Sequence, residues 1–353
     1  MAERVVYGKP GEDIIVQAPA DHTLEWVSED AAHTRVRFRP KATPPVDPPP
    51  VDPPPPTTGR WFDCSVAVPA GAKVYTGAGS LGAVLKALKA GETLVLDFDH
   101  VVSESINIAL ADGVTILPAP LARPWLDGPL RISGGKGVRF YGLNVKWTNA
   151  DSGGHMVKLD GGSIDYAYAE LAHAACYTLL RPGQAIHDTR IHHLWVHDNP
   201  GIGSHDGNQD HGIYCSAENP AQNVVIDHCL VEDMPRGRNI KIGGPSGGGG
   251  AIGGITVRKS TLRLGHGPSN AQVSNGATGI VFEDLILIDS GKSTALTVGS
   301  GAGNGSTYAR CIADRTVGPN NAQLRDAGGN IVVPAVGIDI AAQGRAGRGH
   351  LAA

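Results

Sequence analysis

The sequence predicts an all-β protein in which most of the chain forms a parallel β-solenoid, and three observations lead to this prediction. Glycine supplies 48 of the 353 residues, about twice its usual share of roughly 7%, while charged residues make up only 18%. Short apolar segments recur with a period near 25 residues, which is typical of solenoids. A proline-rich run separates this repeating part from a short leading segment. A helical protein would carry fewer glycines, and a disordered one would not have a net charge as small as −4.

Residues 1–40 are predicted to form a small β-rich N-terminal domain. Asp13–Gln17 and Thr34–Arg39 are short alternating segments that indicate strands. Because about 40 residues seldom hold a stable core alone, we expect this domain to dock on a partner protein.

Residues 41–58 are predicted to be a linker. Ten of the 25 prolines lie between Pro40 and Pro56. Proline fixes φ and has no backbone donor, so the run favours an extended polyproline II spacer without helix or sheet. A ligand for an SH3-type domain is the alternative, but basic residues are sparse here.

Residues 59–93 are predicted to cap the solenoid. Within them, Leu81–Lys89 has its apolar residues at helical spacing, as expected of a helix that covers the exposed end of an apolar core.

The solenoid itself is predicted over residues 94–340, in about ten coils, with residues 341–353 as a C-terminal tail. One coil has apolar residues at positions 0, +2, +5 and +7, as in Val138, Phe140, Leu143 and Val145, and the gap of three marks a bend. The predicted coils begin at Leu94, Val114, Val138, Ile164, Thr189, Val224, Ile255, Ile280, Ser306 and Ile331. An antiparallel sandwich is the alternative, but it offers no reason for so constant a spacing.

This repeat resembles the right-handed parallel β-helix, or pectate-lyase-like, superfamily. Asn223–Cys229 is similar to the Asp-His segment of pectate lyases. Where those enzymes place calcium-binding aspartates, however, Arg236–Lys241 is basic and would repel calcium. The chain therefore departs from the calcium-dependent members.

The leading domain and the linker also resemble bacteriophage tail spikes and minor tail proteins. That resemblance implies a virion location, or otherwise an extracellular one. It also implies contacts to other tail proteins through residues 1–40, a host-surface glycan as ligand, and a homotrimer. Neither nucleic acid nor a membrane span is expected, since charge is balanced and no apolar run reaches the roughly 18 residues of a span.

Two coils exceed the period, those that begin at Thr189 and Val224, and their extra residues must form loops. Both loops are rich in ionisable side chains. Because adjacent coils lie about 4.8 Å apart, we expect these side chains to meet in one groove. The catalytic candidates are His197, His205, Asp206, Asp210, His211 and Glu232. The substrate-binding candidates are Arg236, Arg238, Lys241, Arg263 and Trp195.

These residue types suit two reactions on a polysaccharide. For β-elimination, His197 or His211 would act as base, while Arg236 and Lys241 would neutralise a uronate. Hydrolysis of a glycosidic bond needs two carboxylates, and the candidates for them are Asp206, Asp210 and Glu232.

No metal or other cofactor is expected. The spacing of His197, His205, Asp206 and His211 matches no recognised zinc-binding pattern. Gly247–Gly250 lacks the Lys-Ser/Thr of a phosphate-binding loop. The five cysteines form no CxxC pair and are expected to be isolated thiols.

Outward positions of successive coils should stack into columns. The +8 column would hold His197, Glu232 and Arg263. The +3 column would hold His192, Asp227, Arg258 and Glu283, and the +4 column His193, His228, Lys259 and Asp284. We interpret the +3 and +4 columns as structural, because alternating charge stabilises a parallel stack.

Three functions remain open at this stage. The first is a phage minor tail protein or tail spike that binds, and in one version cleaves, a host polysaccharide. The second is a free carbohydrate-active enzyme, either a polysaccharide lyase or a glycoside hydrolase. The third is a purely structural tail component.

Overall fold

The structure is a computed structural model with two separate units, residues 1–59 and 60–353. In the first unit it describes the backbone of three strands. In the second it describes residues 64, 66–148, 154–183, 185–201, 210–216, 222–243, 252–265, 269–290 and 294–332.

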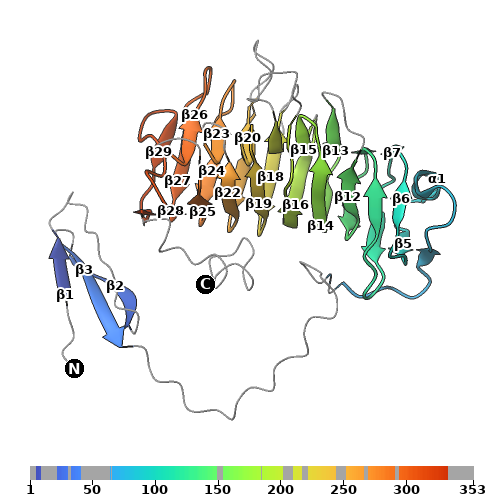
Figure 1. Cartoon of the computed structure of the whole chain (residues 1–353), viewed down its shortest axis with the longest axis horizontal. Coiled ribbons are helices and arrows are strands. Elements are labelled where there is room, and N and C mark those ends of the chain that lie inside the picture. The colour runs from blue at the N-terminus through green and yellow to red at the C-terminus, as the bar shows by residue number, and fades with distance from the viewer. Residues whose placement is uncertain are drawn as a thin grey trace. The chain divides into compact units, whose positions relative to one another are not determined.

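The N-terminal unit contains a three-stranded antiparallel sheet of order β1-β3-β2 (Figure 1). The strands are β1 (Val5–Gly8), β2 (His22–Asp30) and β3 (His33–Pro40). The predicted strand at 34–39 is therefore confirmed, as is the small β-rich domain. The predicted strand at 13–17 and the linker at 41–58 lie outside the described residues.

The second unit is a right-handed parallel β-helix with three faces (Figure 1). Face 1 consists of β4 (Lys73–Tyr75), β5 (Thr93–Leu96), β8 (Thr115–Pro118), β11 (Val138–Tyr141), the first halves of β14 (Ile164–Ala174) and β16 (His187–Val196), β18 (Gln222–Asp227), β21 (Ile255–Arg258), β24 (Val281–Glu283), β27 (Ser306–Ala309) and β29 (Leu324–Asp326). Face 2 consists of β6 (Val101–Ser103), β9 (Trp125–Asp127), β12 (Asn144–Trp147), the second halves of β14 and β16, β19 (Leu230–Met234), β22 (Thr261–Gly265), β25 (Ile286–Ile288), β28 (Ile312–Ala313) and β30 (Ile331–Val332). Face 3 consists of β7 (Ile106–Ala109), β10 (Leu130–Ser133), β13 (His155–Asp160), β15 (Thr178–Pro182), β17 (His211–Cys215), β20 (Ile240–Ile242), β23 (Ala271–Val273) and β26 (Leu296–Val298).

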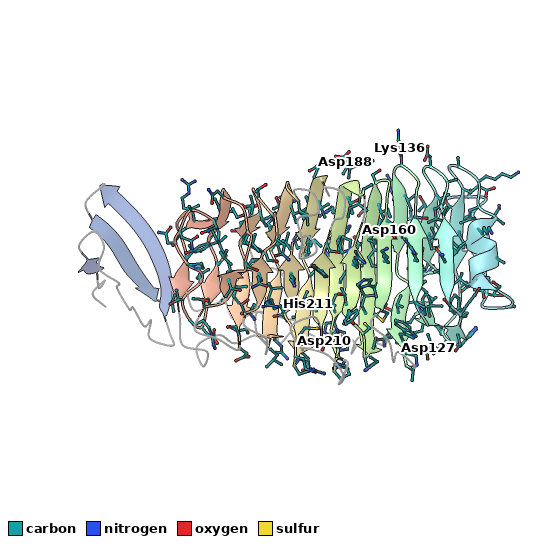
Figure 2. All side chains as sticks on the ribbon, turned by 90° about the horizontal axis from the view of Figure 1, so that it is seen from above. Asp127, Lys136, Asp160, Asp188, Asp210 and His211 are labelled. Atoms are coloured by element: carbon teal, nitrogen blue, oxygen red, sulfur yellow. The ribbon has the colours of Figure 1, made fainter. Side chains whose placement is uncertain are left out.

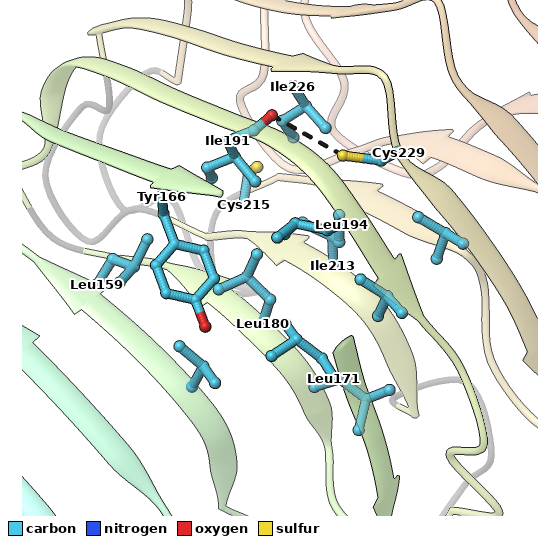
Figure 3. Close-up of a cluster of buried hydrophobic side chains, with 14 of the residues drawn as sticks. Leu159, Tyr166, Leu171, Leu180, Ile191, Leu194, Ile213, Cys215, Ile226 and Cys229 are labelled. Atoms are coloured by element: carbon cyan, nitrogen blue, oxygen red, sulfur yellow. Dashed lines mark hydrogen bonds between the residues drawn. The ribbon is translucent and has the colours of Figure 1, made fainter. Parts of the chain in front are cut away.

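The apolar repeat fills the interior in the predicted register from Val138 to Ala313. Phe140 pairs with Tyr166, which pairs with Ile191, and Phe282 pairs with both Val257 and Tyr308. Residues at inward positions of several coils are all buried: Val138, Phe140, Ile226, Val257, Phe282 and Leu285. Figure 3 shows this core between β13 and β19. Alternation of inward apolar and outward polar residues therefore sets the register of the coils.

The cysteines are isolated thiols, as expected. All five are free, and four of them are buried in the core, where burial raises the pKa of Cys176, Cys215, Cys229 and Cys311 to about 12. The Cys229 thiol donates to the Ile191 carbonyl in Figure 3.

The predicted register is wrong in the first coils. Leu94 pairs with Ile116 rather than with Val114. Leu121 is 69% exposed, and the inward residue of that coil on face 2 is instead Leu126, which pairs with Val145. The corner between β8 and β9 holds more residues than later corners do, so a fixed spacing misplaced the strand that follows it.

The last coil is misplaced because the coil before it, from Ser306 to Leu324, is shorter than the period of about 25 residues. Its face 1 strand begins at Leu324, which pairs with Ser306, whereas Ile331 pairs with Ile312 on face 2. The remaining predicted positions of this coil, Val333, Val336 and Ile338, lie outside the described residues, as does the tail at 341–353.

The bend between faces 1 and 2 is made by residues in the left-handed region. The residues at this +4 position are Tyr168, His193, His228, Lys259, Asp284 and Arg310, and their φ angles lie between 46° and 58°. One such residue per coil turns the chain sharply without a longer loop. The predicted +4 column is therefore the corner of the rod, and His193 and His228 stack within it with ring centroids 5.0 Å apart.

A short helix covers the first coils. Helix α1 (Leu81–Lys86) begins after Ser80, whose hydroxyl accepts a hydrogen bond from the Ala83 N–H at 3.0 Å. Leu81 and Leu85 are buried in the same core as β7. The predicted helix is confirmed, although it ends three residues before Lys89. No helix of the described residues is long and apolar enough to cross a membrane.

Candidate functional site

The exterior of face 2 carries an aromatic and charged network centred on Trp195. Because Leu194 and Val196 point into the core, Trp195 and His197 project outward from the end of β16. The indole stacks on the His197 ring with centroids 3.7 Å apart, and its Nε1–H donates to Glu232 Oε1 at 2.7 Å. The Trp195 side chain is half-buried, so part of it stays accessible to a ligand.

Two glutamates lie on either side of Trp195, one on each neighbouring coil. Glu170 on β14 pairs in register with Trp195, and its Oε1 atom lies 3.3 Å from His197 Nε2. Glu232 on β19 lies on the next coil and pairs in register with Arg263.

Each of these glutamates also binds an arginine. Arg123 forms an ion pair with Glu170, and Arg263 forms one with Glu232. The Arg123 guanidinium also lies 5.6 Å from the centroid of the Trp125 ring. We refer to Arg123, Trp125, Glu170, Trp195, His197, Glu232 and Arg263 as the face 2 network.

Glu170 is ionised in this arrangement. Burial by itself raises the pKa of its carboxyl group, but the hydrogen bond with His197 and the charge of Arg123 outweigh burial and lower it below the ordinary value. The network thus offers a fixed carboxylate and a partly exposed indole on adjacent coils.

A second group of candidate residues lies at the corner that leads into face 3. Asp210 and His211 stand at the start of β17, and Figure 2 shows them side by side on the opposite long edge of the rod from Asp188. Arg236 Nε lies 3.7 Å from Asp210 Oδ2, and the Arg238 backbone N–H donates to His211 Nδ1 at 3.3 Å. Asp210, His211 and Arg238 are all buried.

The surroundings keep His211 neutral. Burial, and then the positive charges of Lys241 and Arg238, hold its pKa well below the ordinary 6.5. Lys241 itself lies with its Nζ 5.1 Å from the centroid of the Tyr214 ring.

Two glycines allow this corner to close around Asp210. A Cβ atom at Gly237 would lie 1.3 Å from the Asp210 carbonyl oxygen, and one at Gly201 would lie 2.2 Å from Asp210 Oδ2. A side chain at Gly237 would require the backbone of the corner to move, and one at Gly201 would displace the Asp210 carboxylate and strain a backbone with φ of 76°.

The contacts of the described residues divide the predicted site into two sets. Trp195, His197, Glu232 and Arg263 belong to the face 2 network, whereas Asp210, His211, Arg236, Arg238 and Lys241 belong to the corner. His205 and Asp206 lie outside the described residues. The catalytic and substrate-binding roles given to all these residues stay predictions.

Sequence reasoning missed Glu170 and Arg123. Glu170 occupies position +6 of its coil, the same position as Trp195 one coil later, so the repeat itself could have revealed it. Arg123 lies in the long corner that the repeat misplaced. Among the described residues, no group of three or more His, Cys, Asp or Glu side chains is arranged to hold a metal ion.

The outward columns follow the predicted register. His192 pairs with Asp227, Asp227 with Arg258, and Arg258 with Glu283. Arg190 also binds Asp227, with Nη2 at 2.9 Å from Oδ2. In the +8 column Glu232 pairs with Arg263, whereas the side-chain contacts of His197 go to Trp195, Glu170 and Asp198.

The chain matches no known protein family and no curated protein. Among solved structures it is similar to ORF18 of Geobacillus virus E2, with 11% identity and a TM-score of 0.51 over 72% of this chain and 58% of the viral one. It also matches the catalytic domain of GH87 alpha-1,3-glucanase D1045A in complex with nigerose (10% identity, TM-score 0.37, 85% and 72% coverage). A third match is an alginate lyase from Paenibacillus sp. str. FPU-7 (13% identity, TM-score 0.30, 71% and 96% coverage). The likeness to the viral protein is one of fold, and the chain matches somewhat more than half of that protein's length.

Proposed function

We propose that this chain is a bacteriophage tail protein, either a tail spike or a minor tail protein, whose β-helix binds a host-surface polysaccharide. The face 2 network is the observation that carries the proposal. A part-exposed indole offers an apolar face to a sugar ring, and the flanking carboxylates and guanidinium groups can bond to its hydroxyls. Such a combination of a flat ring with fixed polar groups suits carbohydrate better than it suits an apolar ligand.

The charges in the site favour binding over cleavage. Hydrolysis needs one carboxyl group with a raised pKa as general acid, but the pKa of Glu170 is lowered. Of the catalytic candidates predicted from the sequence, Asp210 and His211 are buried at the corner. A lyase or hydrolase working through them would need that corner to open first.

The tail role rests on architecture. The fold is shared with a protein of Geobacillus virus E2, and a separate small β-sheet precedes a proline-rich segment and the β-helix. In this proposal residues 1–40 dock on other tail proteins, the linker separates them from the β-helix, and three copies assemble on the virion.

The test is a binding measurement on the full chain with polysaccharides purified from the surface of host cells. We expect saturable binding, and we expect Trp195→Ala to weaken it about tenfold, since a lost sugar–indole contact of about 1.4 kcal/mol has that effect. Thr307→Ala on the exterior of face 1 is the matched control and should bind as the natural chain does. If no host polysaccharide binds, or if Trp195→Ala binds equally well, the proposal is wrong.

The same samples test the alternatives. Product analysis that detects shortened or unsaturated chains would show an enzyme rather than a binding protein. Antibodies against residues 1–40 and against the β-helix, applied to purified virions, test the tail location, because both should label the tail.

A further inference from the structure

A row of cationic side chains follows the exterior of face 3. Arg131, Lys158, Arg181, Tyr214 and Lys241 occupy the same position on β10, β13, β15, β17 and β20. Arg131 pairs with Lys158, Lys158 with Arg181, and Tyr214 with Lys241. Leu180 pairs with Ile213, so the next residues of the two strands, Arg181 and Tyr214, lie beside each other in the same parallel register. We refer to these five residues as the face 3 cation row.

The row has a regular spacing along the rod. Adjacent strands lie about 4.8 Å apart, so Arg131 and Lys241 are separated by about 19 Å along the axis. Asn107 continues the row on one side, and Gln272 and Thr297 continue it on the other. Neutral groups able to form hydrogen bonds therefore extend the charged part at both ends.

The charge of the row is only partly balanced. Asp160, which Figure 2 places between the two long edges of the rod, binds Arg131 at 2.9 Å and Lys158 at 3.0 Å. Arg181 instead contacts two neutral groups, Ser216 Oγ and His155 Nε2, each at 2.7 Å. Among the described residues, the four cations of the row thus form ion pairs with one carboxylate, which leaves a net charge of +3 (4 − 1).

Face 1 provides the contrast. There Arg190 and Arg258 both bind Asp227, and Arg310 binds Glu283 and Asp284. On face 1 these arginines all have acidic partners, whereas on face 3 two of the four cations of the row, Arg181 and Lys241, have no acidic partner among the described residues.

Two histidines respond to this positive potential. The pKa of His155 falls to about 3 through burial and then through the charges of Arg181 and Lys158. Burial and then Lys241 and Arg238 act on His211 in the same direction. The Arg131 side chain is 49% exposed, and the other members of the row are partly exposed, so part of each side chain can be reached by an anionic ligand.

We infer that the face 3 cation row binds a linear acidic polysaccharide, laid along the rod with a carboxylate-bearing sugar near each cation. This inference rests on the proposed function and names the class of glycan. Cations repeated at the strand spacing offer a series of contacts to a polymer whose acidic groups also repeat regularly. Arginine forks suit carboxylates, and the Tyr214 ring offers one apolar contact in the middle of the row.

Single-stranded nucleic acid is the less suitable polyanion. Proteins that bind it combine cations with several aromatic rings on which bases stack, and the row has a single ring. It therefore enters the test as a competitor.

The test uses the full chain with polygalacturonate as the acidic probe, dextran as the neutral one and an oligothymidylate as the nucleic acid. We expect saturable binding of polygalacturonate that weakens as salt rises, and little binding of dextran or oligothymidylate. Arg181→Gln and Lys241→Gln should each weaken binding about fivefold. Arg310→Gln on face 1 removes the same charge and should change it less than twofold.

Thermal unfolding of each variant shows whether it is folded. If Arg181→Gln does not fold because the Arg181 contacts are lost, Lys241→Gln still tests the inference. Equal binding of dextran, tighter binding of oligothymidylate, or an effect of Arg310→Gln as large as that of Lys241→Gln would each overturn the inference. If Trp195→Ala weakens binding of a host polysaccharide while neither face 3 variant does, the inference fails and the proposed function stands. If no host polysaccharide binds at all, both fail.

Discussion

The Trp195 indole donates to the Glu232 carboxylate at 2.7 Å, and this hydrogen bond joins the outer surfaces of two successive coils. Glu232 also binds Arg263 on the coil after that. One carboxylate thus fixes the orientation of the indole while an arginine keeps it in place, so that the aromatic surface is set before any ligand arrives. Preorganisation of this kind lowers the entropic cost of binding.

Glu232→Ala should therefore weaken polysaccharide binding even if Glu232 never touches the sugar. We expect a loss of about three- to tenfold, with a loss of stability of about 1 kcal/mol because Arg263 and the indole N–H lose their acceptor. Glu232→Gln keeps an acceptor for the indole and should recover most of the binding. Equal binding by the alanine variant would contradict the positioning role.

The observed register can be tested by truncating one residue that it places in the core and one that it places on the surface. Phe282→Ala removes a buried side chain and should lower the free energy of unfolding by about 3–5 kcal/mol. Leu121→Ala should change it by less than about 0.5 kcal/mol, because Leu121 is 69% exposed. Denaturant unfolding measures both changes. A large effect of Leu121→Ala would support the sequence-predicted register instead of the observed one.

The predictable part of the fold is the part in which the corner between faces 1 and 2 has the same length in every coil. Between Val138 and Ala313 the alternation of apolar and polar residues fixes both the strands and their pairing, because a shift by one residue would turn the core outward. The register failed around Leu121 and Ile331, where corner length changes and no apolar pattern records it.

The candidate site was less predictable for a related reason. Trp195, Glu232 and Arg263 share outward positions, so their neighbourhood follows from the repeat. Contacts that cross a corner, such as that of Arg123 with Glu170, depend on the path of an irregular loop, which periodicity does not specify.

Gly237→Ala should disrupt the corner that holds Asp210 and His211. The added Cβ would lie 1.3 Å from a backbone oxygen that cannot move without shifting β17, so we expect a loss of about 3 kcal/mol or more. Gly253→Ala is the matched control, since its nearest neighbour, the Thr278 carbonyl oxygen, is 3.3 Å away. Comparable melting temperatures for the two variants would show that the corner is looser than described.

Stability should fall as the pH drops below neutrality. The pKa of His155 is lowered from 6.5 to about 3, so the unfolded chain takes up a proton between these values that the folded chain does not. Stability from this group is complete above pH 6.5 and decreases by at most about 1.4 kcal/mol per pH unit as the pH falls toward 3. His155→Gln, which can still accept from Arg181, should flatten the dependence of melting temperature on pH between 4 and 6. An unchanged slope would show that His155 does not contribute.

The most direct test of the central claim is a tryptophan fluorescence titration of the full chain with purified host-surface polysaccharide. If the β-helix binds glycan through the face 2 network, the emission should change saturably, and Trp195→Phe should remove most of that change while the chain remains folded. If no fraction of the host's surface glycans changes the emission, or if the Trp195→Phe chain responds as the natural one does, the face 2 network is not a glycan site.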